Sequence, residues 1–405
     1  MRKKNVNIFL AALVNILLLL GACGVLFAAD FEDAEEALQG LKEGWAWPVV
    51  VVAPPEGWAS EQGEAIKWSM RAAEREISLN REAIRGREVT FMFSSVANSS
   101  ELVERIKTWR AMGVAAIVSF GDDGIGETLS YLCRDDGPSV LFAGGENAAV
   151  LNPTTTQPYR HLFALDLPYF ARANALAELA TQEDRKKRVA VISDILSERL
   201  AKGARLNVEL LRARDAEVLD LSVTGFRQDQ FVPQIRDFES GGFRIFSVWL
   251  DAMATLSIWR TTHMNRNGSE VHYAGNMHRL LLDAEGLLLV DKDVLLERNE
   301  RGKNDIITIV RDRFNRRISE PVLGAKAYAL AKWVLAGYTG AGSAEPGLVA
   351  DALARAVDIP LMDEMLRIDP TTHRPNSRKF GVLRVEERAF KSAGSVEVFS
   401  REVSE

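Results

Sequence analysis

The sequence predicts an α/β fold with two successive doubly wound lobes, each built on a parallel sheet that helices cover. Short apolar and β-branched runs alternate with helical segments along most of the 405 residues, beginning at 48–53. Such alternation is typical of parallel strands joined by helical crossovers. The alternation restarts after Tyr159, and the 47 % hydrophobic content is enough for two cores of ordinary domain size.

The first half of the chain is predicted to form four strands and three helices. Ile66, Met70 and Ala73 recur three or four residues apart, which gives the first helix one apolar face. The predicted strands lie near 48–53, 88–93, 114–119 and 139–143, and the predicted helices near 65–79, 100–112 and 125–133.

The second half repeats this pattern. The predicted strands lie near 188–193, 216–221, 244–249 and 270–274, and the predicted helices near 197–213, 252–266 and 325–337. Residues 291–320 are strongly charged around an apolar piece at 306–310, which favours a surface helix and loop. The glycine-rich run at 340–343 is typical of a flexible joint.

An export leader is predicted at residues 1–29, because basic residues at 2–4 precede an apolar stretch at 6–29. Residues 20–23 are similar to a bacterial lipoprotein box, in which Cys23 would be lipidated. Cleavage near Ala28 and retention as a membrane anchor are the alternatives. The acidic segment 30–46 suits a spacer, and a periplasmic or extracytoplasmic location follows.

Charge and composition exclude several function classes. A formal net charge of -6 provides no electrostatic footprint for nucleic acid. The 2 cysteines, Cys23 and Cys133, cannot build a structural zinc site, and Cys133 is expected to be a buried thiol. The glycines at 121–126 lack dinucleotide-binding spacing, and the 5 histidines show no metal-binding pattern. No cofactor, metal or catalytic cluster is therefore expected.

Several motifs occur in the order and spacing of a known family. They are the loop and helix at 59–80, the I-x-G-R-x-V segment at 84–89, the strand and glycine at 113–121, and the D-P-T-T-H segment at 369–373 before the strand at 380–383. With these motifs the chain resembles the type I periplasmic solute-binding proteins of ABC importers, in the leucine/isoleucine/valine-binding branch.

The resemblance implies a type I periplasmic-binding fold with two lobes joined by three hinge crossings, near 163–168, 282–288 and 356–361. Lobe 1 would comprise residues 47–165 and 285–357, and lobe 2 would comprise 166–284 and 358–405. A solute would be trapped between the lobes, which close because the closed state binds it better.

Ligand contacts are expected in the loops that follow the strands, since ligands of open α/β sheets bind outside the carboxyl ends of the strands. The candidates in these loops are Trp58, Ser60, Gly121, Asp122, Asp123, Gly144, Gly145, Glu146, Asp194, Glu198, Trp249, Asp251 and Asn276.

The carboxylates in this set are unusual for the family, which more often has Ser or Thr at these points. Asp122, Asp123 and Glu146 would repel a solute carboxylate, and together with Trp58 and Trp249 they favour an ammonium-bearing solute. The alternative is that Asp122 and Asp123 only cap the helix that follows, while backbone N–H groups hold an anion.

The expected function is the extracytoplasmic solute-binding component of an ABC importer. It would capture an amine-containing solute, an amino acid or a relative, and would have ABC permease subunits as partners and the membrane as its anchor through a lipid or the leader. It would perform no chemistry. A membrane-anchored sensory module is the first alternative, and an exported α/β enzyme, which would need a catalytic cluster that the sequence does not show, is the second.

Overall fold

The computed structural model divides the chain into two compact units. Unit 1 comprises Met1–Leu165 and Gly302–Pro375, and unit 2 comprises Asp166–Arg301 and Asn376–Glu405. The structure describes residues 31–32, 46–80, 87–143, 150, 155, 157–165, 169–182, 187–224, 228–264, 268–275, 279–292, 306–356, 359–361, 364–375 and 379–397.

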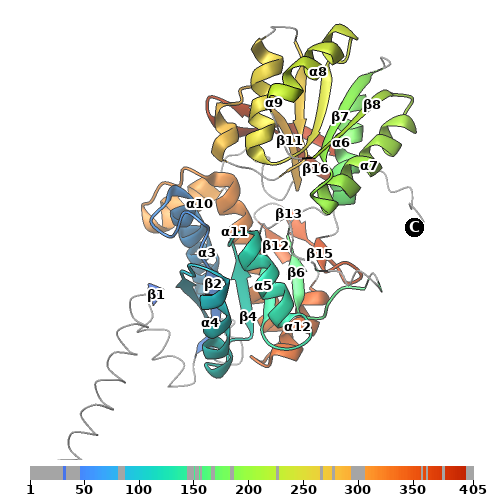
Figure 1. Cartoon of the computed structure of the whole chain (residues 1–405). Coiled ribbons are helices and arrows are strands. Elements are labelled where there is room, and N and C mark those ends of the chain that lie inside the picture. The colour runs from blue at the N-terminus through green and yellow to red at the C-terminus, as the bar shows by residue number, and fades with distance from the viewer. Residues whose placement is uncertain are drawn as a thin grey trace, which may run out of the picture. The chain divides into compact units, whose positions relative to one another are not determined.

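Unit 1 contains a six-stranded sheet in the order β1-β3-β2-β4-β5-β6 (Figure 1). Its strands are β1 (Phe31–Glu32), β2 (Ala46–Val52), β3 (Glu88–Ser94), β4 (Ala116–Ser119), β5 (Ser139–Phe142) and β6 (Leu162–Ala164). All neighbours pair in parallel except β1, which runs antiparallel to β3. β2 is buried along its whole length, as expected for a central parallel strand that is covered on both faces.

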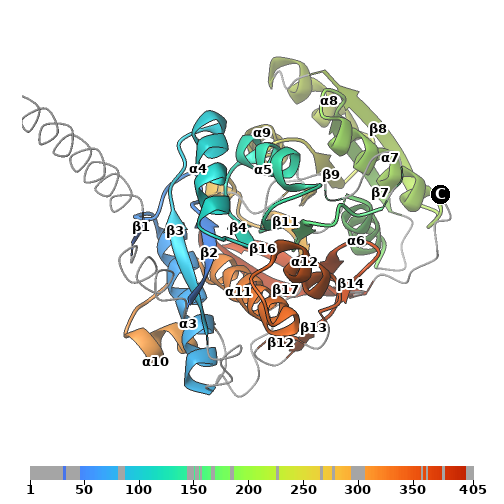
Figure 2. The same ribbon diagram turned by 90° about the horizontal axis from the view of Figure 1, so that it is seen from below.

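Helices cover both faces of this sheet. They are α3 (Glu61–Asn80), α4 (Ser99–Ala111), α5 (Asp123–Cys133), α10 (Ile306–Phe314), α11 (Pro321–Ala341) and α12 (Pro346–Ala354). Figure 2 shows α4 and α5 on one side of the central strands and α3 and α11 on the other. Trp109 and Leu129 form a core with Val50 beneath α4 and α5.

A partly buried carboxylate joins three helices of unit 1. Tyr328 on α11 donates a hydrogen bond to Glu76 on α3 at 2.5 Å, and Lys332 Nζ lies 3.2 Å from the same oxygen. Arg313 on α10 lies 3.5 Å from the other oxygen. Burial opposes ionisation of Glu76, but the hydrogen bond from Tyr328 and the charges of Lys332 and Arg313 outweigh it and lower the pKa of the carboxyl.

Unit 2 contains a seven-stranded sheet in the order β17-β16-β11-β10-β9-β7-β8. Its parallel strands are β7 (Arg188–Asp194), β8 (Glu217–Val223), β9 (Ile245–Trp249), β10 (Glu270–Tyr273) and β11 (Leu288–Lys292), and an antiparallel hairpin of β16 (Lys379–Glu386) and β17 (Ala389–Glu397) follows. The helices α6 (Tyr169–Thr181) and α7 (Glu198–Arg212) contribute to one core, and α8 (Gln228–Ser240) and α9 (Ala252–Met264) contribute to another.

The chain passes between the units at different points from those predicted, except for the first. The change after Leu165 coincides with the expected boundary. Residues 288–292 do not join lobe 1, because β11 pairs with β10 and β16 in the second sheet. Residues 364–375 lie in unit 1, where β14 (Ile368–Asp369) and β15 (Arg374–Pro375) pair and the Ala164 N–H donates to the carbonyl of His373 at 3.2 Å.

Other expectations are settled by burial and helix bounds. Cys133 is fully buried, and burial raises the pKa of its thiol to about 11, which confirms a structural thiol. Trp109 and Trp333 are fully buried, whereas Trp259 is only partly buried. The expected joint at 340–343 is wrong in its bounds, since α11 continues to Ala341 and Gly342 ends it with a left-handed φ of 55°.

Substitution Glu76→Ala is expected to lower the free energy of unfolding by about 1–3 kcal/mol, because the Tyr328 hydroxyl and Lys332 would lose their acceptor. Chemical denaturation measures this change. The pKa of Glu76 is lowered from its usual 4.5, so its contribution should be present above that pH and disappear as the pH falls through the lower folded value. Glu104→Ala removes an exposed ion pair with Lys107 and should change stability by less than about 1 kcal/mol. Equal effects of the two substitutions would contradict the role of Glu76.

Candidate functional site

The first candidate loops lie at one edge of the unit 1 sheet. Val52, at the end of β2, is in register with Ser94 at the end of β3 and with Ser119 at the end of β4. The carboxyl ends of these three strands therefore lie side by side, and the loops that follow them share one edge.

The loop after β2 holds Trp58 and Ser60. Ser60 donates to the Gly57 carbonyl at 2.7 Å and accepts from the Gly63 N–H at 3.0 Å, so its hydroxyl begins α3. The Trp58 ring meets Phe93 edge-on at 5.1 Å. The indole N–H of Trp58 is buried, and no acceptor contacts it in the described part of the chain. The loop therefore offers one unused donor beside an aromatic pair.

The loop after β4 holds Gly121 and Asp122. The Gly121 N–H donates to the Ser119 hydroxyl at 3.3 Å. Asp122 accepts from the Ile125 N–H at 2.9 Å through Oδ1 and is the N-cap of α5. The capping interpretation of Asp122 is therefore confirmed, while contact with a solute stays a prediction.

Several predicted residues cannot be placed. Asp123 is the first residue of α5, and Glu198 is the first residue of α7, but their side chains lie outside the described structure. Gly144, Gly145, Glu146 and Asn276, and Cys23 in the leader, lie outside the described residues altogether.

Two serines at the same edge of unit 1 were missed by the sequence analysis. Ser94 and Ser119 end β3 and β4, with 0% and 1% of their surface exposed. The Ser94 hydroxyl has no hydrogen-bond partner within the described structure. Both serines were missed because candidates were sought only after the strands. The available signal was a small hydroxyl residue at the last position of an apolar strand.

Two candidate carboxylates of unit 2 accept local hydrogen bonds. Asp194, at the end of β7, accepts from the Leu196 N–H at 2.9 Å. Asp251, after β9, accepts from the Ala254 N–H at 2.8 Å and thereby caps α9. Each therefore has a structural role that does not require a ligand.

Trp249 is a core residue of unit 2 and not the loop contact that was predicted. Only 1% of its surface is exposed. Its N–H donates to Ser247 at 3.2 Å, and Ser247 donates to Asn207 at 2.9 Å. A Cβ at Gly203 would lie 2.1 Å from the Trp249 ring, so α7 approaches the ring closely. The side chain faces α7 because of the strand pleat, which directs it away from the following loop.

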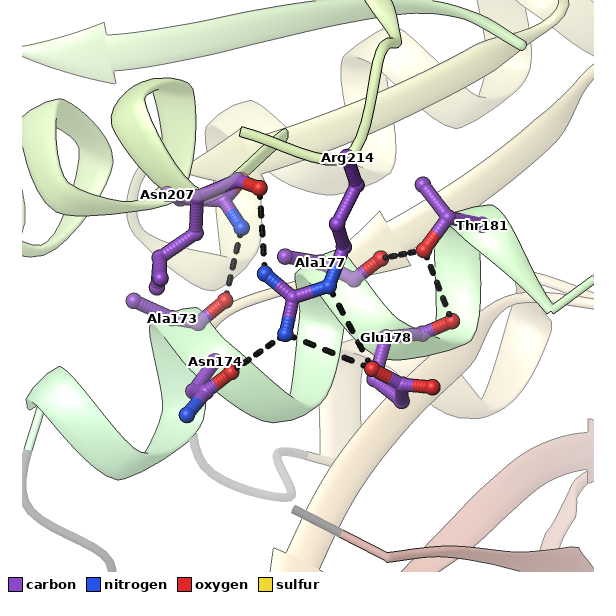
Figure 3. A network of polar contacts seen from close by, with 8 residues as sticks. Ala173, Asn174, Ala177, Glu178, Thr181, Asn207 and Arg214 are labelled. Atoms are coloured by element: carbon purple, nitrogen blue, oxygen red, sulfur yellow. Dashed lines mark hydrogen bonds and ion pairs between the residues drawn. The ribbon is translucent and has the colours of Figure 1, made fainter. Parts of the chain in front are cut away.

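The same region is held by polar contacts between α6 and α7. Asn207 donates to the Ala173 carbonyl at 2.8 Å, and Arg214 donates to Asn174 at 2.8 Å and to Glu178 at 3.3 Å (Figure 3). These contacts hold α6 and α7 together on the face of the second sheet that Trp249 packs against.

Four apolar side chains beside the unit 2 strand ends are exposed. Ile195 and Leu196 follow β7 and are 50% and 70% exposed, and Met253 in the first turn after β9 is 57% exposed. Leu280, after β10, is 39% exposed. These four residues are called the apolar edge below. The sequence analysis overlooked them because it selected polar and aromatic candidates.

No family model matches the sequence, and no curated protein matches it. Solved structures do match. A leucine-binding protein from Thermotoga maritima superposes with a TM-score of 0.67 at 14% identity, over 87% of this chain and 99% of that chain. A branched-chain amino acid ABC transporter periplasmic ligand-binding protein from Burkholderia xenovorans has a TM-score of 0.70 at 11% identity, over 87% and 96%. A solute-binding protein from R. palustris in complex with benzoate has a TM-score of 0.63 at 12% identity, over 88% and 98%.

The fold is therefore the type I periplasmic-binding fold, as predicted. Its structural neighbours are solute-binding proteins of ABC transporters and not enzymes. Within the described residues, no helix is both long enough and apolar enough to cross a membrane.

Substitution Asp122→Ala should lower the free energy of unfolding by about 1 kcal/mol, because α5 loses its N-cap. Asp122→Asn should leave stability almost unchanged, since an amide oxygen caps as well as a carboxylate does. Thermal and urea denaturation measure both variants. Equal stability of Asp122→Ala and the parent would contradict the capping role.

Proposed function

We propose that this protein is the extracytoplasmic solute-binding component of an ABC importer and that it captures a small solute by closure of its two units. The observation that supports this proposal is the fold. The structural match to the Thermotoga leucine-binding protein covers 87% of this chain and 99% of that protein. The loops at the carboxyl ends of the parallel strands are where such folds bind ligands. Permease subunits are the proposed partners, and lipidation of Cys23 or a retained leader is the proposed anchor.

The first proposed solute class is an amine-containing molecule, an amino acid or a relative. Capping uses only Oδ1 of Asp122, so Oδ2 of this exposed carboxylate is available for an ammonium group. Trp58 adds an aromatic surface that can attract a cation. Asp123, Glu146 and Asn276 belong to the same proposal.

The second candidate solute has an apolar body. It is favoured by the apolar edge, because Leu196 and Met253 stay exposed beside the strand ends of unit 2. An apolar group that covers these side chains would remove their surface from water, which stabilises a complex. In this candidate, the Trp58 N–H and the Gly121 loop would hold the polar end of the solute.

A thermal-shift screen against amino acids, amines, amides, sugars and aromatic acids is expected to identify a stabilising solute. A solute at one hundred times its dissociation constant should add about 2.7 kcal/mol to the free energy of unfolding. Calorimetry then measures the affinity of each hit. Absence of any hit across the panel would count against transport and favour the sensory alternative.

Two variants distinguish the solute classes. For an amine, Asp122→Asn should weaken binding about tenfold, whereas for an apolar body Leu196→Ser should weaken it about tenfold, given about 1.5 kcal/mol for covering a leucine side chain. Tyr131→Ser is the matched control, because Tyr131 on α5 is also 70% exposed and lies outside the candidate loops. Unchanged affinity in both variants would contradict the contacts proposed for Asp122 and Leu196.

A further inference from the structure

Two chain segments of unit 1 lie directly before points where the chain passes to unit 2. β6 ends at Ala164, just before the first change, which follows Leu165, and β15 ends at Pro375, just before the third change. These segments are about two hundred residues apart in sequence, yet they are hydrogen-bonded. The Ala164 N–H donates to the His373 carbonyl at 3.2 Å, and His373 Nδ1 donates to the Leu162 carbonyl at 3.0 Å.

The His373 ring adds a second connection. It stacks on Phe163 with ring centres 4.5 Å apart and planes 11° apart. Phe163 in turn meets Trp333 of α11 edge-on at 5.7 Å, and the Trp333 N–H donates to the Leu353 carbonyl of α12 at 3.1 Å. Both segments are thereby fastened to the helical core of unit 1.

A turn that begins at Asp369 carries His373 and fixes its backbone. The Asp369 carboxylate accepts from the Thr371 N–H at 2.8 Å and from the Thr371 hydroxyl at 2.6 Å. The His373 N–H donates to the Asp369 carbonyl at 2.8 Å, and His373 has a left-handed φ of 51°. Such a φ is uncommon for a residue other than glycine and is kept only where the surroundings hold it.

The environment of the ring disfavours its protonation. His373 is 6% exposed. Burial lowers its pKa below the ordinary value, although hydrogen bonds to the carbonyls of Leu162 and Tyr159 oppose the change. A neutral imidazole keeps one N–H, so it can stack on Phe163 and still donate a hydrogen bond to the Leu162 carbonyl.

We propose that His373 is a positioning residue that joins the two chain segments into one rigid structure, called the root below. Two of the three connections between the units begin at this root. If the segments moved separately, each connection would add its own freedom and the orientation of unit 2 would vary more widely. This inference rests on the proposed function, because a defined closing motion matters only for a protein that closes on a solute.

The test is the distribution of distances between the units, measured by pulsed electron spin resonance without any solute. The full chain carries Cys23→Ser, with nitroxide labels at Tyr131→Cys in unit 1 and Asp220→Cys in unit 2, both at exposed positions. Cys133 is fully buried and should not react. His373→Asn tolerates a left-handed backbone but removes the stacked ring, and it should widen the distance distribution.

Two further variants make the result decisive. Thr371→Val removes a hydroxyl that donates to Asp369 at an exposed position, so it should widen the distribution even if His373→Asn fails to fold. Tyr338→Phe removes a buried hydrogen bond to the Pro48 carbonyl elsewhere in unit 1 and should leave the width unchanged. The inference is overturned if the folded His373→Asn and Thr371→Val variants keep the distance distribution of the parent. It is also overturned if Tyr338→Phe widens the distribution equally. A solute screen without hits would affect only the proposed function.

Discussion

The register of the parallel strands in unit 1 is the constraint on which its candidate site depends. Val52 pairs with Ser94 on one side and with Ser119 on the other, so three strands end at the same level. Each strand can stay in this register because helices cover both faces of the sheet and bury β2 completely. A shift of one residue would move Ser94 and Ser119 to the opposite face and separate the loops that follow them.

The polar groups at the strand ends of both units already take part in hydrogen bonds within the protein, and this limits the contacts that they can make to a ligand. Asp122 and Asp251 each cap a helix, and Ser60 begins another. A capping carboxylate keeps one oxygen for a partner, whereas a capping hydroxyl that also donates has no further proton to donate. The groups that remain include Oδ2 of Asp122 and the Trp58 N–H in unit 1 and the apolar edge in unit 2. The carboxylate oxygen supports an amine-containing solute and the apolar edge supports a solute with an apolar body, which is why two solute classes compete.

Much of the fold could be predicted from the sequence because local pattern determined it. The run at 46–52 is long, apolar and β-branched, and the helix at 61–80 has a regular apolar face, so both were located closely. β6 and α12 were missed because they are short, and α6 because small alanines leave its apolar face unmarked. β11 was assigned to the wrong lobe since strand pairing with β16 is a long-range choice that no local pattern encodes.

The sequence by itself determined the alternation of strands and helices, and hence the class of fold, because the periodicity of apolar residues is a local property. It also offered a helix cap as one of two roles for Asp122, since a cap needs only the residues that follow it, and the structure established that cap. Only the tertiary structure decided that Trp249 packs against Gly203 and that His373 stacks on Phe163. Those contacts join residues far apart in the chain, and they depend on which face of a strand or turn meets which helix.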